Sequence, residues 1–69
     1  MPLAMMESGA KGKVSAIRGD DAAKKHLNEL GFVEGAEIEV VSSVGGNVIV
    51  ALYGSRLALN RDLAMRIMV

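Results

Sequence analysis

The sequence predicts a small, mainly β barrel of about five strands, with one amphipathic helix inserted after the first strand. Short β-prone runs recur at close spacing and are separated by turns that contain glycine. One stretch, residues 21–30, instead carries its apolar residues at helical spacing. Strands this short favour closure into a barrel, because closure removes exposed sheet edges. With 69 residues, we expect a single domain over residues 1–69.

The first strand and the helix are predicted in sequence order. The run GKVSAIR, residues 12–18, is β-prone and bounded by glycines, so it reads as one strand. Asp20 is expected to cap the helix by accepting a backbone N–H, and Asp21 adds negative charge at the positive end of the helix dipole. The apolar face of this helix is predicted to consist of Ala23, Leu27 and Leu30.

The segment LGFVEG, residues 30–35, holds two glycines four positions apart. Gly31 is predicted to end the helix with positive φ, since glycine adopts the left-handed conformation without a Cβ clash. Phe32 is then expected to fold back on the last helical turn. Gly35 is predicted to reverse the chain into the next strand.

The rest of the chain predicts three meandering strands, a short turn of helix and a last strand. In AEIEVVSS, residues 36–43, one face is predicted to carry Ala36, Ile38 and Val40, and the other Glu37, Glu39 and Val41. Gly45-Gly46 and Gly54-Ser55 are the predicted turns on either side of the strand NVIVALY, residues 47–53. The remaining predicted elements are the strand RLALN, the helical turn RDLAM and the strand RIMV.

Composition excludes several classes of function. The chain has no cysteine, so it has neither a disulfide framework nor a thiolate metal site. Eight basic and eight acidic residues give zero net charge, and the only aromatic residues are Phe32 and Tyr53. Because a nucleic-acid-binding barrel usually has a basic groove and stacking aromatics, we expect no nucleic acid partner. The same lack of aromatics argues against a groove for proline-rich peptides.

The sequence also indicates where the protein works. The longest apolar run, residues 48–53, is far shorter than the roughly 20 residues that span a bilayer. The N-terminus lacks the basic region of a signal peptide. We therefore expect a cytoplasmic protein without direct membrane insertion.

No pattern in the chain indicates an enzyme or a resident metal. His26, the only histidine, lies at i, i+3 from Glu29 on the predicted helix. Two ligands on an exposed helix are fewer than iron or zinc sites usually have. There is no phosphate-binding GxxxxGK[ST] motif. We expect no catalytic residue, no cofactor and no metal ligand.

Several motifs together resemble the FeoA family of small proteins associated with bacterial ferrous iron uptake. They are Gly12, Val14 and Ile17; L..LGF..G..I.V from Leu27 to Val40; Gly54; LAL at 57–59; and Ala64, Ile67 and Val69. The resemblance covers the chain from about residue 3 to Val69. The chain departs from the family at Glu34 and Asn47, where family members often have proline.

The resemblance implies an SH3-like barrel and an accessory, non-enzymatic role, with binding of transition metals known at the level of the family. It also implies a partner, the FeoB-type membrane transporter with its cytoplasmic GTPase region. The same module occurs in metal-dependent transcriptional repressors, so a regulator module that binds a peptide segment is the alternative. A small metal-sensing protein is a further alternative.

Strand alternation predicts a partner-binding surface. If Val48, Val50 and Leu52 face the core, then the alternate residues of the same strand face outward. Contiguous exposed apolar area marks interaction sites, and methionine adapts well to such surfaces. The predicted surface consists of Ile49, Ala51, Tyr53, Met65 and Met68. Its cover would be the transporter, a second copy in a homo-oligomer, or the N-terminal segment PLAMM, residues 2–6.

Overall fold

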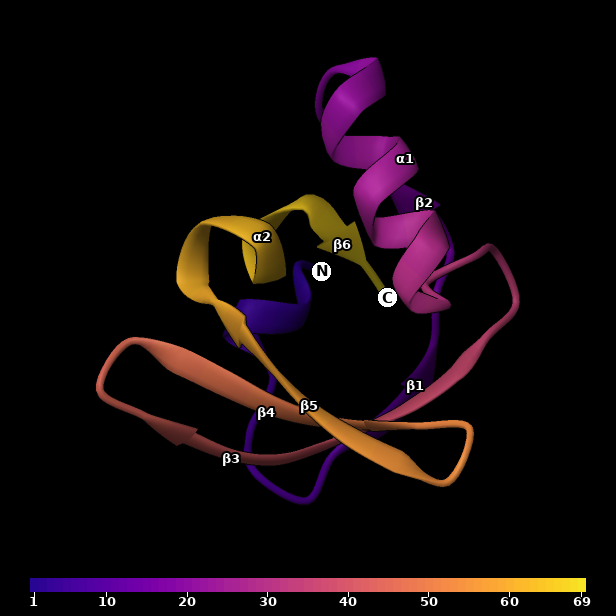
Figure 1. The fold of residues 1–69 in the computed structure, drawn as a ribbon. Coiled ribbons are helices and arrows are strands. Elements are labelled where there is room, and N and C mark those ends of the chain that lie inside the picture. The colour runs from indigo at the N-terminus through magenta and orange to yellow at the C-terminus, as the bar shows by residue number, and fades with distance from the viewer.

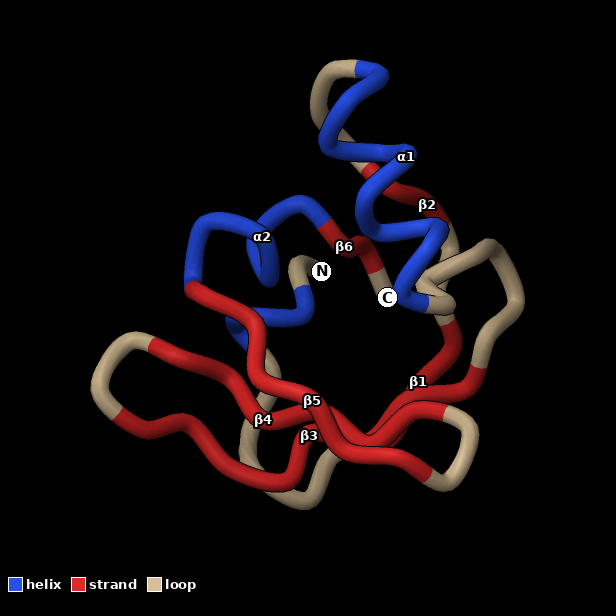
Figure 2. The backbone as a smooth tube through the Cα atoms, viewed as in Figure 1, coloured by secondary structure: helices blue, strands red, loops and turns tan.

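A computed structural model describes residues 1–69 and shows two antiparallel sheets around one core. The elements are η1 (Leu3–Met5), β1 (Lys11–Lys13), β2 (Ala16–Ile17), α1 (Asp21–Leu30), β3 (Glu37–Val44), β4 (Asn47–Leu52), β5 (Ser55–Asn60), α2 (Arg61–Arg66) and β6 (Ile67–Met68). A four-stranded sheet, in the order β1-β3-β4-β5, forms one side, and η1, α2 and the β2–β6 pair form the other (Figures 1 and 2). The predicted mainly β class with an inserted helix is confirmed.

The predicted first strand, residues 12–18, is divided between the two sheets. β1 pairs with β3, whereas β2 pairs with β6. Between them, the backbone of Val14 donates to Ala36 and accepts from Gly35, and the Val14 side chain is buried. The prediction of one continuous strand is therefore wrong, because the chain changes sheets where the barrel closes. The division raises the strand count to six.

Helix α1 begins and ends where the sequence predicts. Oδ1 of Asp20 accepts the Ala23 N–H at 2.8 Å. Gly31 has φ +110°, and its N–H bonds to Asn28 while the N–H of Phe32 bonds to Leu27. This pair of bonds is the Schellman motif, which satisfies carbonyls that the helix end would otherwise leave free. Phe32 is fully buried, as its predicted return onto the helix requires.

The predicted apolar face of α1 is confirmed only in part. Leu27 is fully buried and Ala23 is half-buried, but Leu30 is exposed. Leu30 is the last residue of α1 and directly precedes the glycine that ends the helix, whereas the N-terminal end of α1 projects away from the barrel (Figure 1). Leu30 is therefore a surface residue.

The central strands place alternate side chains in the core. Ile38, Val40 and Ala36 are buried, as are the inward residues Val48, Val50 and Leu52 of β4, so the predicted alternation is confirmed. It is interrupted at Val41, where a β-bulge shifts the register between Val40 and Ser42. Beyond the bulge, Ser42 lies opposite Ile49 on the outer face.

The turn after β4 lies one residue earlier than predicted. Leu52 pairs with Ser55, so the two turn residues are Tyr53 and Gly54, with φ of +51° and +78°. A two-residue hairpin with positive φ at both positions is the type I′ turn, whose twist matches that of the flanking strands. Tyr53 is the only residue other than glycine with positive φ. It is a turn residue, not the end of a strand.

The N-terminal segment completes the core. Leu3 is fully buried, η1 packs on α2 and β6, and Pro2 forms a β-bridge with Met68. The segment PLAMM thus covers the side of the barrel formed by α2 and β6. The short helix α2 starts at a cap in which Asn60 Oδ1 accepts the Leu63 N–H at 2.8 Å. None of the helices has the length and apolar character needed to cross a membrane.

Candidate partner-binding surface

Ile49 and Ala51 lie on the outer face of the sheet, and both are half-buried. Ile49 lies between Ser42 of β3 and Ala58 of β5. Ala51 has Glu39 on one side and Arg56 on the other. Three of these four neighbours are polar, which limits the apolar area that the stripe can offer to a partner.

Met65 and Met68 do not join that stripe. Met65 is on α2 and is partly exposed, whereas Met68 is on β6, half-buried, and paired with Ala16 of β2. Both elements close the barrel on the side opposite the four-stranded sheet (Figure 1). The structure therefore separates the five predicted residues into two groups.

Tyr53 stands out from both groups because it is 70% exposed and lies against the end of α1. A Cβ atom built on Gly31 would lie 3.3 Å from Cε2 of Tyr53, so the ring packs against the Gly31 backbone. Leu30, just before Gly31, and Val33, just after it, are also exposed. We name Leu30, Val33 and Tyr53 the Tyr53 corner.

The sequence prediction missed Leu30 and Val33. The helical spacing predicts a buried Leu30, and no pattern in the sequence indicates a role for Val33. The available signal is in LGFVEG: Phe32 is the residue that returns to the core, and Leu30 before the helix stop and Val33 after Phe32 are both left exposed.

The backbone of Tyr53 is strained. An L-residue in the left-handed region costs about 1–2 kcal/mol, and asparagine, aspartate or glycine usually occupies such a turn position. Strained residues of this kind concentrate at functional sites, where their side chains are held in a required position. Here the strained residue is also the only tyrosine and the most exposed large apolar side chain in the molecule.

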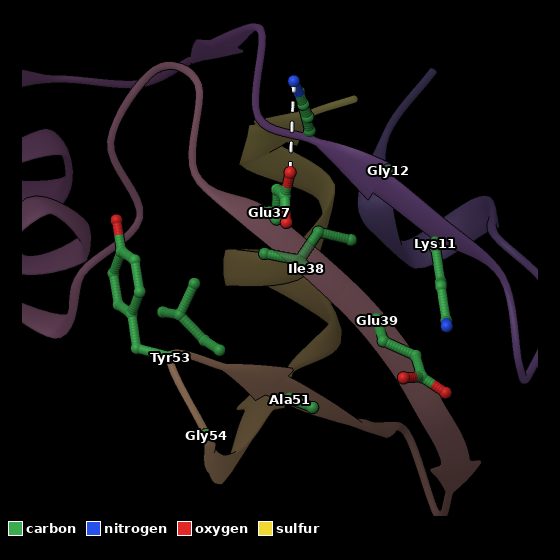
Figure 3. Close-up of a pocket in the computed structure, with 10 residues that line it drawn as sticks. Lys11, Gly12, Glu37, Ile38, Glu39, Ala51, Tyr53 and Gly54 are labelled. Carbon is green, nitrogen blue, oxygen red and sulfur yellow. Dashed lines mark ion pairs between the residues drawn. The ribbon is translucent and has the colours of Figure 1, made fainter.

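Two open hollows meet at Tyr53. The first is a groove of about 530 Å³ lined by residues 11–13, 37–39 and 51–54. In Figure 3, Tyr53 stands at one side of this groove, Ala51 lies along β4, and Lys11 and Glu39 lie at the far side. The second hollow, about 570 Å³, is lined by residues 33–37 together with Tyr53 and Gly54. The tyrosine therefore forms a wall shared by two concave surfaces.

The charges along the groove balance. Lys13 Nζ lies 4.0 Å from Glu37 Oε1 (dashed in Figure 3), and Lys11 lies opposite Glu39 in the β1–β3 register. Both side chains of the ion pair are largely exposed, so the pair contributes little to stability. Two lysines and two glutamates in alternation give no local excess of either sign, which does not favour a polyanionic partner.

The ionisable side chains lie at the surface of the molecule. No polar side chain is buried, and no three His, Cys, Asp or Glu residues lie close enough together to hold a metal ion. His26 and Glu29 are exposed on α1. The absence of a metal ligand at His26 stays a prediction. What the Tyr53 corner does offer is exposed apolar surface beside two hollows, which suits contact with another protein.

Comparison with known proteins places these features in a family. The FeoA domain model matches residues 1–69. A protein of Methanocaldococcus jannaschii named "Putative Fe(2+) transport protein A" is 35% identical over 68 residues, which are 99% of this chain and 83% of that protein.

Solved structures share the fold. A crystal structure of an iron uptake regulatory protein, FeoA, matches with a TM-score of 0.89 and 38% identity over 96% of this chain and 88% of that chain. The FeoA of Stenotrophomonas maltophilia in complex with zinc, described as an SH3 domain protein, matches with a TM-score of 0.83 and 31% identity over 99% and 87%. A manganese-dependent transcriptional repressor has a TM-score of 0.89 but 20% identity over 97% of this chain and 39% of that chain, a likeness of fold alone.

Proposed function

This chain belongs to the FeoA family of ferrous iron transport proteins, and we propose that it is a non-enzymatic accessory protein that binds a FeoB-type transporter. In this proposal it works in the cytoplasm and contacts the GTPase region of the transporter. The relative from Methanocaldococcus jannaschii, whose name refers to Fe(2+) transport, supports the assignment to iron uptake. The specific partner is our inference from the family.

The surface that we propose for this contact is the Tyr53 corner together with Ala51 in the adjoining groove. The observation that carries the proposal is Tyr53 itself, a strained residue whose ring is 70% exposed. Tyrosine is enriched among residues that dominate binding energy at protein interfaces, because it buries a large area and still offers a hydroxyl group. The hollows on both sides of the ring would receive side chains of the partner.

Other predicted residues have secondary places in this proposal. Ile49 lies on the same outer face but is half-buried among its own neighbours, so we expect it to contribute at the rim. Met65 and Met68, on the other side of the barrel, are outside the proposed contact. The regulator alternative has less support, because the likeness to the repressor extends to the fold alone.

The test is a calorimetric titration of the chain with the cytoplasmic domain of a FeoB-type transporter, with and without a guanine nucleotide. Tyr53→Asn removes the ring while asparagine still accepts the left-handed conformation. We expect the affinity to fall about tenfold or more, as for a residue that dominates an interface. The matched control is Val44→Asn, because Val44 is 65% exposed and lies at the far β3–β4 hairpin. This control is expected to bind like wild type.

Folding of the Tyr53 variant is not expected to confound the titration. Removing a ring that is about 30% buried costs on the order of 1–1.5 kcal/mol of lost burial. Relief of the left-handed strain returns about 1 kcal/mol. The two terms nearly cancel, so the unfolding midpoint should stay close to that of wild type. Wild-type affinity in the folded Tyr53→Asn variant would refute the proposed surface, and a wild-type chain that binds in neither nucleotide state would refute the proposed partner.

A further inference from the structure

The strand β5 is an open edge of the four-stranded sheet. It pairs with β4 on one side and with no strand on the other. In Figure 1, β5 lies in front of β4 and β3, and no other element passes in front of it along its length. Its six residues, Ser55–Asn60, include no proline, and no bulge interrupts its pairing with β4.

Proteins usually protect such an edge with lysines, prolines, bulges or very short strands. β1, the edge strand at the other end of the sheet, follows this rule, because it has three residues and two of them are lysines. β5 is twice as long and carries only Arg56 as a charged residue. The unprotected edge is therefore specific to β5.

The hairpin fixes which backbone groups of β5 face outward. Leu52 and Ser55 close a two-residue turn, so they form a hydrogen-bonded pair, and such pairs recur at every second residue of an antiparallel ladder. Leu57 and Leu59 consequently bond to β4. The N–H and C=O groups of Arg56 and Ala58, and the N–H of Asn60, point to the free edge.

We propose that β5 pairs with β5 of a second copy of this chain, antiparallel about a two-fold axis at Ala58. In this register Ala58 of each copy exchanges two hydrogen bonds with Ala58 of the other. The N–H of Asn60 bonds to Arg56 C=O of the second copy, and the reciprocal bond also forms. The two sheets join into one, and Leu57, which is half-buried in the single chain, packs beside Leu59 of the second copy.

Charge favours this register over the neighbouring one. Centring the axis on Leu57 would place the two Arg56 side chains diagonally across the strands, on the order of 8 Å apart and within reach of their mutual repulsion. Centring it on Ala58 moves them four residues apart along the strands, or roughly 14 Å, and places Arg56 opposite the neutral Asn60. Only small alanine side chains then meet at the axis.

The free edge of β5 can pair with the same edge of a second copy, because the strand is complementary to itself in sequence and in hydrogen-bonding pattern. Four backbone hydrogen bonds and two symmetry-related leucine contacts form a small interface, and association itself is costly. We therefore expect a weak dimer, with a dissociation constant of about 10 µM to 1 mM. This inference is independent of the proposed transporter contact.

The test is analytical ultracentrifugation of the full chain over that concentration range. Wild type is expected to show a monomer–dimer equilibrium. Ala58→Lys and Ala58→Glu each place two like charges face to face at the axis, and each should weaken the dimer about tenfold or more. Ala58 is exposed, so both variants should keep the wild-type circular dichroism. A one-to-one mixture of the two variants should recover the dimer, because opposite charges then meet at the axis.

The matched control places the same charge elsewhere on the sheet. Val44→Lys changes an exposed apolar residue at the β3–β4 hairpin and should dimerise like wild type. The proposal fails if wild type is monomeric throughout, if Ala58→Lys dimerises as wild type does, or if mixing the two Ala58 variants restores nothing. If β5 instead pairs with a strand of another protein, wild type alone would be monomeric throughout.

Discussion

Substituting Gly31 with alanine should destabilise the barrel and move the Tyr53 ring. The same substitution at Gly35 should destabilise the barrel less and leave the ring in place. Both glycines have positive φ, +110° and +87°, so alanine is strained at either position, at about 1–2 kcal/mol. The difference lies in their surroundings. A Cβ on Gly35 would have no atom within 4 Å, but one on Gly31 would lie 3.1 Å from Leu52 Cδ2 and 3.3 Å from Tyr53 Cε2.

The extra cost at Gly31 follows from which neighbour can move. Leu52 is 3% exposed and held in the core, whereas the Tyr53 ring is 70% exposed and can swing outward. Overpacking in a fixed environment typically costs about 1–3 kcal/mol. We therefore expect Gly31→Ala to lower the free energy of unfolding by about 2–4 kcal/mol and Gly35→Ala by about 1–2 kcal/mol.

Two measurements check this expectation. Urea unfolding followed by circular dichroism gives the free energies, and a variant with an unchanged m-value has lost stability without a change in compactness. Fluorescence reports the ring directly, because the chain contains one tyrosine and no tryptophan. The Tyr53 emission should change in folded Gly31→Ala and stay unchanged in Gly35→Ala. Equal destabilisation of the two variants, with equal emission, would refute the packing argument.

Two further predictions concern the N-terminal segment and metal binding. Leu3→Ala should lower the free energy of unfolding by about 2–5 kcal/mol, since Leu3 is fully buried. Met5→Ala, an exposed position on the same short helix, should change the free energy of unfolding by less than about 0.5 kcal/mol. Thermal unfolding of the two variants decides whether this segment is part of the core. Zinc or ferrous iron added at one equivalent should leave the His26 ring signals unshifted in NMR spectra, because no third ligand lies near it, and a specific shift shared with Glu29 would contradict this.

The parts of the fold that were predictable from the sequence are those set by local interactions. The cap at Asp20 and the stop at Gly31 depend on groups within a few residues of each other, so the sequence contains the whole cause. Alternation in β4 is equally local, since neighbouring side chains of a strand point to opposite faces. These predictions needed no knowledge of distant contacts.

The errors arise where distant contacts decide the outcome. The strand predicted over residues 12–18 divides because its first half pairs with β3 and its second half with β6, both far along the chain. The bulge at Val41 and the early turn at Tyr53 follow from the pairing of β4 with its neighbours on both sides. None of these partners is identifiable from the local pattern, which indicates a strand but not its register.

The candidate surface shows the same limit. Alternation correctly predicts that Ile49 and Ala51 face outward, but it gives the orientation of side chains only within one strand. It could not show that β6, with Met68, lies on the opposite side of the barrel from β4. Leu30 has the spacing of a core residue, yet it is exposed at the last position of α1, because spacing within a helix does not show which turns the rest of the fold covers.

Gly31 links the helix stop to the proposed contact surface. Its positive φ alone would explain why glycine follows the helix, as it does for Gly35 at the next turn. Gly31 has a second constraint, because the Tyr53 ring and Leu52 occupy the space that a side chain would need. The ring is thus positioned by the end of α1 while its backbone is strained by a turn that tyrosine does not favour. Asparagine or glycine would suit this turn better than tyrosine does, so the presence of tyrosine here supports our proposal that its exposed ring contacts a partner.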